Sequence, residues 1–158
     1  MAWLFDRTSL TARLVRHCRL RHGTGFRVEV LRQRIAAPTA DERQVLKLRA
    51  RHHAIIREVK LYCGERAMVY ARTVIPLTTV TGAQRIYANT GSRPLGAMLF
   101  ADKSMRRGEV TVSCLQPGDR LYPNTAADGQ GVWGRRSVFR VGGKPLLVSE
   151  YFLPAIYR

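Results

Sequence analysis

The sequence has few acidic residues, few cysteines and no long apolar run. Asp and Glu number 11 against 27 Lys and Arg, so the formal net charge is +16. The apolar start at Trp3 is interrupted at once by Asp6 and Arg7, which excludes the apolar core of a signal peptide, and nothing later is long enough for a membrane span. We therefore expect a cytoplasmic protein with no membrane span.

The three cysteines, Cys18, Cys63 and Cys114, are odd in number and far apart, without a C-x-x-C spacing. Such a pattern is more typical of reduced thiols in a cytosol than of a disulfide framework. We expect all three to be small packing residues.

Recognised metal and nucleotide motifs are also missing. His17, Cys18 and His22, or the pair His52 and His53, do not form a set of three or four ligands at a known spacing. The segment 23–25 is too short for a phosphate-binding loop and does not lead into a predicted helix. We expect no metal and no organic cofactor.

The positive charge is spread along the chain rather than gathered in a basic tail. Many arginines alternate with apolar residues, as at Arg27-Val28 and Arg34-Ile35, which is typical of a solvated face. A nucleic-acid-binding module is the alternative, but it would need clustered aromatic residues or a known motif. We expect no specific nucleic-acid partner, and a surface that attracts small anions.

A length of 158 residues and a hydrophobic content of 46% suit a single domain spanning residues 1–158. Strand patterns and separate helices follow one another without regular β-α-β alternation, which predicts an α+β fold with an antiparallel sheet. The predicted strands are residues 26–35, 54–62, 67–75, 109–115, 132–141 and 146–153. The predicted helices are residues 10–22, capped by Thr8 or Ser9, and 41–48, 79–88 and 94–100.

Residues 116–131 are dense in Pro, Gly, Asn and Asp and are predicted to be a loop. The loop is either a surface excursion or a segment that folds over a ligand pocket.

Two predicted strands carry a charged residue among apolar neighbours: Arg72 in one and Glu150 in the other. An ionised side chain is costly to bury unless a partner binds it. Each has a purely structural alternative. The Arg72 head can reach water past its apolar stem, and Glu150 can pair with an arginine such as Arg136.

Four motifs together resemble the chorismate pyruvate-lyase family over roughly the C-terminal two-thirds of the chain. They are Arg72-Thr73-Val74-Ile75-Pro76, Pro94-Leu95-Gly96, Trp133-Gly134-Arg135-Arg136-Ser137 and Glu150-Tyr151-Phe152-Leu153-Pro154. The resemblance implies helical flaps over an enclosed ligand pocket, and cofactor-free conversion of chorismate to 4-hydroxybenzoate and pyruvate. In the family the product commonly feeds ubiquinone synthesis. We expect a monomer.

The resemblance also implies roles for individual residues. Arg72 and the main chain at Leu95 and Leu10 would hold a ligand carboxylate, while Glu150 would contact the ring hydroxyl. Arg72 and Glu150 are the predicted catalytic residues. Glu150 would act either as a base or as a group that positions an intramolecular proton transfer. Substrate and product share the groups that are bound, so product inhibition is expected.

A related fold serves as the effector-binding domain of GntR-type transcription regulators. This gives a rival interpretation, a domain that senses a small aromatic acid without catalysis. Those regulators carry a winged-helix domain in front, and we expect no room for one before residue 26.

Overall fold

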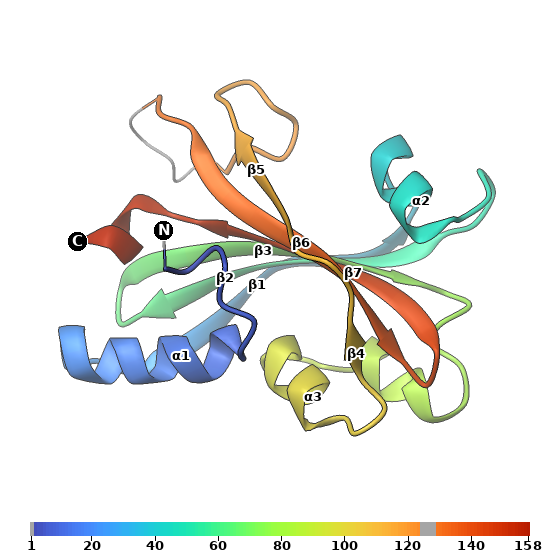
Figure 1. Ribbon diagram of the computed structural model, residues 1–158, viewed down its shortest axis with the longest axis horizontal. Coiled ribbons are helices and arrows are strands. Elements are labelled where there is room, and N and C mark those ends of the chain that lie inside the picture. Colours follow the sequence, from blue (N-terminus) through green and yellow to red (C-terminus); the bar gives the residue numbers. More distant parts are fainter. Residues whose placement is uncertain (1, 124–128) are drawn as a thin grey trace.

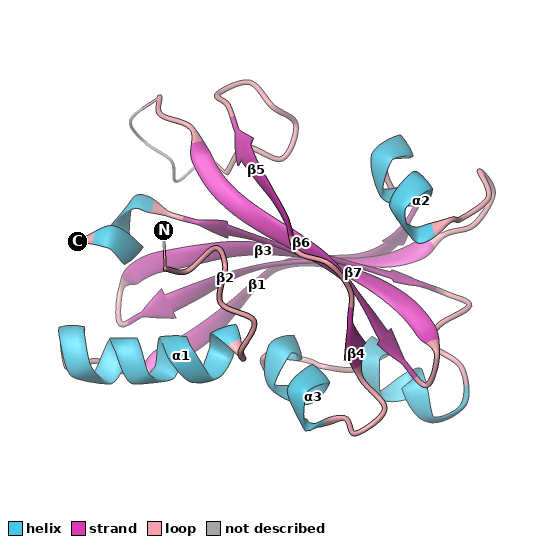
Figure 2. Cartoon of the chain, in the orientation of Figure 1, coloured by secondary structure: helices cyan, strands magenta, loops and turns pink. Residues whose placement is uncertain are grey.

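Seven strands form one antiparallel sheet in the order β1-β2-β3-β7-β6-β4, with β5 also paired to β6 (Figures 1 and 2). The structure is a computed structural model and describes residues 2–123 and 129–158. The strands are β1 (Phe26–Ala36), β2 (Ala54–Cys63), β3 (Arg66–Pro76), β4 (Arg106–Arg107), β5 (Thr111–Leu115), β6 (Val132–Val141) and β7 (Lys144–Phe152). The prediction of a single α+β domain with an antiparallel sheet is confirmed.

Short helices cover the two faces of the sheet. Figure 1 shows α1 (Leu10–His17) and α3 (Leu95–Ala101) side by side on one face, while α2 (Ala40–Leu46) lies on the other. A π-helical turn (Cys18–His22) continues α1, and two 3-10 helices (Gly82–Ala88 and Pro154–Tyr157) complete the set. No helix among the residues described is long and apolar enough to cross a membrane.

Capping residues set where two of the helices begin. The Ser9 side chain accepts a hydrogen bond from the Ala12 N–H at 3.3 Å. Ser9 is one of the two residues that the sequence offered as the cap of α1. Thr39 and Glu42 form a complete capping box at α2, in which each side chain accepts from the other's backbone N–H. Local chemistry therefore accounts for both starts.

Two segments differ from the prediction. The expected helix over residues 79–88 is a 3-10 helix over Gly82–Ala88 only, because Thr79 is instead tied to the sheet, its hydroxyl donating to the Pro145 carbonyl at 2.7 Å. The two-residue strand β4 was not predicted. It is too short to show an alternating pattern.

The described part of the loop 116–131 lies on the α2 face of the sheet. Leu121 borders a surface pocket there with Asp41, Arg136 and Tyr151. Residues 124–128 lie outside the described part. None of residues 116–123 and 129–131 lines the cavity that lies beneath α1 and α3.

Two apolar clusters pack beneath α1 and α3. Under α1, Leu14 is buried with Met68 and Phe152. Under α3, Leu99 is buried with residues of the β3, β6 and β7 strands. A cavity separates the two clusters, and both helices reach it with their N-terminal ends.

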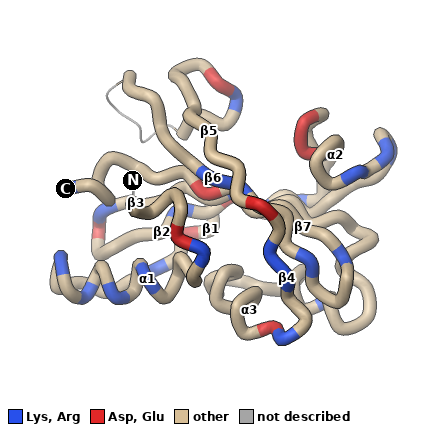
Figure 3. The backbone as a smooth tube through the Cα atoms, in the orientation of Figure 1, with Lys and Arg blue, Asp and Glu red and all other residues tan. Residues whose placement is uncertain are grey.

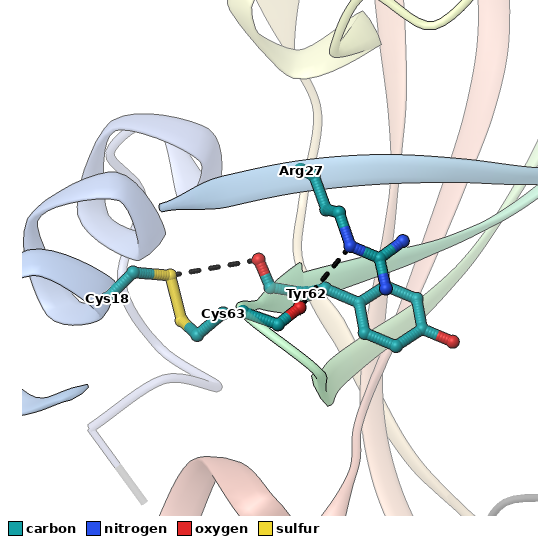
Figure 4. Close-up of a disulfide and its surroundings, with 5 residues drawn as sticks. Cys18, Arg27, Tyr62 and Cys63 are labelled. Carbon is teal, nitrogen blue, oxygen red and sulfur yellow. Dashed lines mark hydrogen bonds between the residues drawn. A yellow bond between two sulfur atoms is a disulfide. The ribbon is translucent and has the colours of Figure 1, made fainter. Parts of the chain in front are cut away.

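Cys18 and Cys63 form a disulfide, so the prediction of three reduced thiols is wrong for this pair, and only Cys114 is free (Figure 4). Their Cα atoms are 5.0 Å apart although 45 positions separate them in sequence. The pairing could not be predicted from the sequence because of this long separation. It arises because the π-helical turn that follows α1 lies over the end of β2. The bond fastens that segment to the sheet.

Removing this cross-link should destabilise the oxidised protein. Closing a loop of this length restricts the unfolded chain by about 4 kcal/mol in the chain-entropy treatment. We expect the double variant Cys18→Ser/Cys63→Ser to lose up to about that much free energy of unfolding in urea titrations without reductant. Cys114→Ser is the matched control and should unfold like the wild type. Equal stability of the double variant and the wild type would contradict the role given to the bond.

Candidate active site

The cavity lies between the sheet and the N-terminal ends of α1 and α3. Its walls are mostly apolar, with Leu10, Leu95 and Phe139 among them. Four charged side chains line it as well: Arg57, Arg107, Arg135 and Glu150. An apolar enclosure with a few charged groups is the usual form of a site for a small ligand.

Strand register places these residues on one face. Paired residues in neighbouring antiparallel strands project to the same side of a sheet. Two adjacent rows of such pairs cross β2, β3, β7 and β6 beneath the cavity. They are Arg57, Thr73, Val148 and Ser137 in one row, and Val59, Ala71, Glu150 and Arg135 in the other.

Arg72 lies on the opposite face. Its register partners are Glu58 on β2 and Ser149 on β7, whereas Glu150 pairs with Ala71. Arg72 and Glu150 therefore project to opposite sides of the sheet. The prediction that both point into one pocket is wrong in this structure, because the true register differs by one residue from the one that would align them.

Arg72 is fully engaged where it lies. Two of its N–H groups bind the Glu42 carboxylate at 2.8 and 2.9 Å, and a third binds Glu58 at 2.9 Å. Its exposed fraction is 7%. Burial alone would raise the pKa of Glu42, but the hydrogen bonds from Arg72 and Thr39 outweigh it and lower that pKa. The guanidinium thus already holds two carboxylates.

Arg57 supplies the buried cation that the sequence interpretation assigned to Arg72. Its exposed fraction is 2%, and it donates to the Gln33 side chain at 3.0 Å and the Arg93 carbonyl at 3.2 Å. No carboxylate in residues 2–123 or 129–158 lies within ion-pair distance of it. Burial lowers its pKa. A buried cation without a counter-ion on the wall of a cavity is suited to bind an anion.

Glu150 pairs with an arginine, as its structural alternative allowed, but the partner is Arg135 and not Arg136. The Arg135 Nε donates to the Glu150 carboxylate at 2.8 Å, and the Glu150 side chain keeps an exposed fraction of 15%. Arg136 projects to the other face and pairs with Asp41. Glu150 therefore lines the cavity as predicted, held in place by a neighbouring arginine.

Leu10 and Leu95 stand at the cavity as predicted, each the first residue of its helix. The first N–H groups of a helix have no acceptor inside it. An added Cβ at Gly96 would lie 2.9 Å from the Thr11 hydroxyl, so glycine permits the close approach of α3 to α1. The structure thus brings Leu10, Leu95 and Glu150 together around the cavity, with Arg57 in the place expected for Arg72.

The cavity carries an excess of positive charge. Three arginines against one glutamate leave two positive charges. Figure 3 shows that basic residues also occur along most elements of the chain, so the cavity lies in a generally positive molecule. A dianion is the ligand that would balance these charges. The described residues contain no group of three or more His, Cys, Asp or Glu side chains arranged to hold a metal ion.

Solved structures of transcription regulators share this fold. A GntR-family regulator from Bacillus cereus matches with a TM-score of 0.64 at 12% identity, over 84% of this chain and 94% of that one. PhnF from Mycobacterium smegmatis matches with a TM-score of 0.67 at 11% identity, over 96% of this chain and 66% of that one. At these identities the likeness shows the fold alone. Fold and cavity together define a small α+β protein with a positively charged cavity beneath α1 and α3.

Sequence comparison identifies the family. The chorismate lyase family model matches residues 1–158. A Methylococcus capsulatus protein named "Probable chorismate pyruvate-lyase" is 44% identical over 98% of this chain and 94% of its own length. An Azoarcus protein of the same name is 43% identical over 98% of this chain and 83% of its own. The chain belongs to the chorismate lyase family.

Replacing Arg72 should damage the fold rather than the cavity. Arg72→Met leaves the buried Glu42 without a cation and leaves Glu58 with only its longer ion pair to Arg32, which costs on the order of 3–5 kcal/mol. The pKa values of both glutamates are lowered in the folded wild type. The ion pairs therefore stabilise the wild type fully above the ordinary glutamate pKa. This stabilisation is lost as the pH falls through the lowered pKa values.

We therefore expect urea titrations to show a large deficit for Arg72→Met at pH 7 that shrinks towards pH 4, where the unpaired carboxyls take up protons. The exposed Arg66 on the same strand provides the control, Arg66→Met, with little change expected. Wild-type stability of Arg72→Met at pH 7 would show that the ion pairs do not hold the α2 face.

Proposed function

We propose that the protein is a chorismate pyruvate-lyase that converts chorismate into 4-hydroxybenzoate and pyruvate without a metal or an organic cofactor. The observation that carries the proposal is the enclosed cavity with two surplus positive charges and Glu150. Chorismate is a dianion of matching charge. Family membership and the names of the relatives support the same activity.

In this proposal Arg57 and Glu150 hold the two ends of the ring. They lie on β2 and β7 with β3 between them, about 10 Å apart across the sheet at two strand spacings. The ring carboxylate and hydroxyl of chorismate lie at opposite ends of the ring. Arg57 binds the carboxylate with help from the N–H groups at Leu95 and Leu10, and Glu150 accepts a hydrogen bond from the hydroxyl.

The reaction needs little beyond this placement. The bond between the ring and the enolpyruvyl oxygen breaks, and its electron pair leaves with the oxygen. The hydroxyl-bearing carbon loses its hydrogen as a proton, the ring becomes aromatic, and the enolpyruvyl methylene gains a proton to give pyruvate. Glu150 either relays that proton or holds the ring for direct transfer. A dry pocket that holds the substrate in one reactive conformer accelerates the reaction.

A second function is a sensor of aromatic acids, which the shared fold of the GntR-family regulator favours. Binding alone would use the same arginines. Turnover distinguishes the two functions. As part of the main proposal, the protein is a cytoplasmic monomer whose product feeds ubiquinone synthesis.

Turnover is tested directly with the purified chain. We expect chorismate to yield pyruvate and 4-hydroxybenzoate in equal amounts, with activity unchanged after exhaustive chelation, because aromatisation provides the driving force. Pyruvate is measured with a coupled dehydrogenase and the aromatic product by chromatography. Binding of chorismate without turnover would favour the sensor, and loss of activity on chelation, restored by one divalent ion, would refute the cofactor-free mechanism.

Arg57→Gln should weaken binding of 4-hydroxybenzoate on the order of 10- to 100-fold, because a buried charge-assisted contact is lost. The wild type should be inhibited competitively by this product and much less by benzoate, which lacks the hydroxyl partner of Glu150. Calorimetric titration measures the affinities for 4-hydroxybenzoate and benzoate. Arg66→Gln is the exposed control, and wild-type affinity in Arg57→Gln would refute the assignment.

A further inference from the structure

Arg107 carries a second unbalanced charge on the cavity wall. It lies on β4, and its Nε donates to the Ser137 hydroxyl at 3.2 Å while another N–H reaches the Arg7 carbonyl at 3.3 Å. Its guanidinium stacks 5.1 Å from the centre of the Phe139 ring. No carboxylate of the described chain is within ion-pair distance, and the proposed carboxylate contact at Arg57 leaves this cation unused.

The position of Arg107 is at the Glu150 end of the cavity. Ser137 pairs with Val148, in the row next to the one that joins Arg135 to Glu150. Burial and the positive charge of Arg135 both lower the pKa of Arg107, and Glu150 only partly offsets them. A bound anion at this end would relieve the repulsion between the two arginines.

Arg57 stands at the far end of the same row. Three strand spacings separate it from Ser137, about 14 Å across the sheet. One carboxylate cannot satisfy both cations. Arg135 is a poorer candidate for a second carboxylate, since its guanidinium already serves Glu150 and the carbonyls of Trp3 and Asp6.

We propose that Arg107 forms a second carboxylate subsite, which binds the enolpyruvyl carboxylate of the substrate. This inference rests on the proposed lyase function. In chorismate the enolpyruvyl ether is attached to the carbon next to the hydroxyl-bearing one, so a hydroxyl on Glu150 brings the side-chain carboxylate to the Arg107 end. After the ether bond breaks, that carboxylate belongs to pyruvate, and 4-hydroxybenzoate has nothing for Arg107 to bind.

The subsite therefore separates substrate from product. Arg57 and Glu150 contact groups that both molecules share, whereas Arg107 contacts a group that only the substrate has. Its binding energy favours chorismate over the product that competes with it.

Two stable ligands isolate this contact. One is 3-(carboxymethoxy)-4-hydroxybenzoate, which keeps the ring carboxylate, the hydroxyl and an ether-linked carboxylate beside it. The other is 4-hydroxy-3-methoxybenzoate, which has the same ring and a neutral ether. Calorimetry gives the dissociation constant of each, and of 4-hydroxybenzoate, for the wild type and for Arg107→Gln, Arg107→Lys and the control Arg106→Gln. Arg106 is the exposed neighbour on β4 and does not line the cavity.

We expect the wild type to prefer the dicarboxylate over the methoxy compound on the order of 10- to 100-fold. Arg107→Gln should abolish this preference and lower kcat/KM for chorismate by a similar factor, while its affinity for 4-hydroxybenzoate stays within about twofold. Arg107→Lys should keep part of the preference because it keeps the charge. Arg106→Gln should behave as the wild type.

Two results would overturn the subsite: a wild type without the preference, or an Arg107→Gln variant that retains it. A wild type without the preference rejects the subsite even if the variant does not fold, and Arg107→Lys tests the assignment to Arg107 in that case. Failure of the proposed function looks different, since the wild type would then not convert chorismate, whether or not it binds 4-hydroxybenzoate. A wild type that does both but lacks the preference rejects the Arg107 subsite alone.

Discussion

The register between β3 and β7 decides which charges meet. Ala71 faces Glu150 and Arg72 faces Ser149 across this pair of strands. Alternate residues of a strand project to opposite sides, so a shift of one residue would exchange the two faces. In the register observed, Arg72 meets Glu42 and Glu58, and Arg32 supplies a second positive charge to Glu58, so the charges cancel on the α2 face. On the α1 and α3 face Arg57 and Arg107 stay uncompensated. One sheet thus combines a self-contained ion-pair cluster with a cavity whose positive charge is not balanced by the described residues.

The sequence predicted the order of the elements well because local chemistry fixes it. Alternating strand patterns, the Ser9 cap and the helix that begins at Leu95 all appear where expected. It also indicated Glu150, whose apolar neighbours marked a charge that needs a partner. Arg57 lies in a predicted strand too, but Glu58 and Lys60 follow it closely, so no single charge stood out among apolar neighbours there.

What the sequence could not provide depends on contacts between distant segments. The register of β3 on β7 requires knowing how the two strands align, and the capping residue Glu42 gives no sign that its carboxylate also binds Arg72 across 30 positions. The Cys18–Cys63 bond is of the same kind, since two cysteines 45 positions apart become neighbours only after the helix is laid on the sheet. Family motifs located the cavity but not the face that each motif residue occupies.

Two arginines of the cavity also hold the chain segment that precedes α1. Arg107 and Arg135 donate to backbone carbonyls of the segment that precedes α1, at Arg7, Asp6 and Trp3. Beyond the other end of α1, the following turn is fastened covalently to β2 through Cys18. Packing holds the segment before Leu10 as well, because Trp3 and Leu4 are buried in the apolar cluster under α1. Because the same guanidinium groups face the cavity, a bound anion would act on the donors that hold this segment in place.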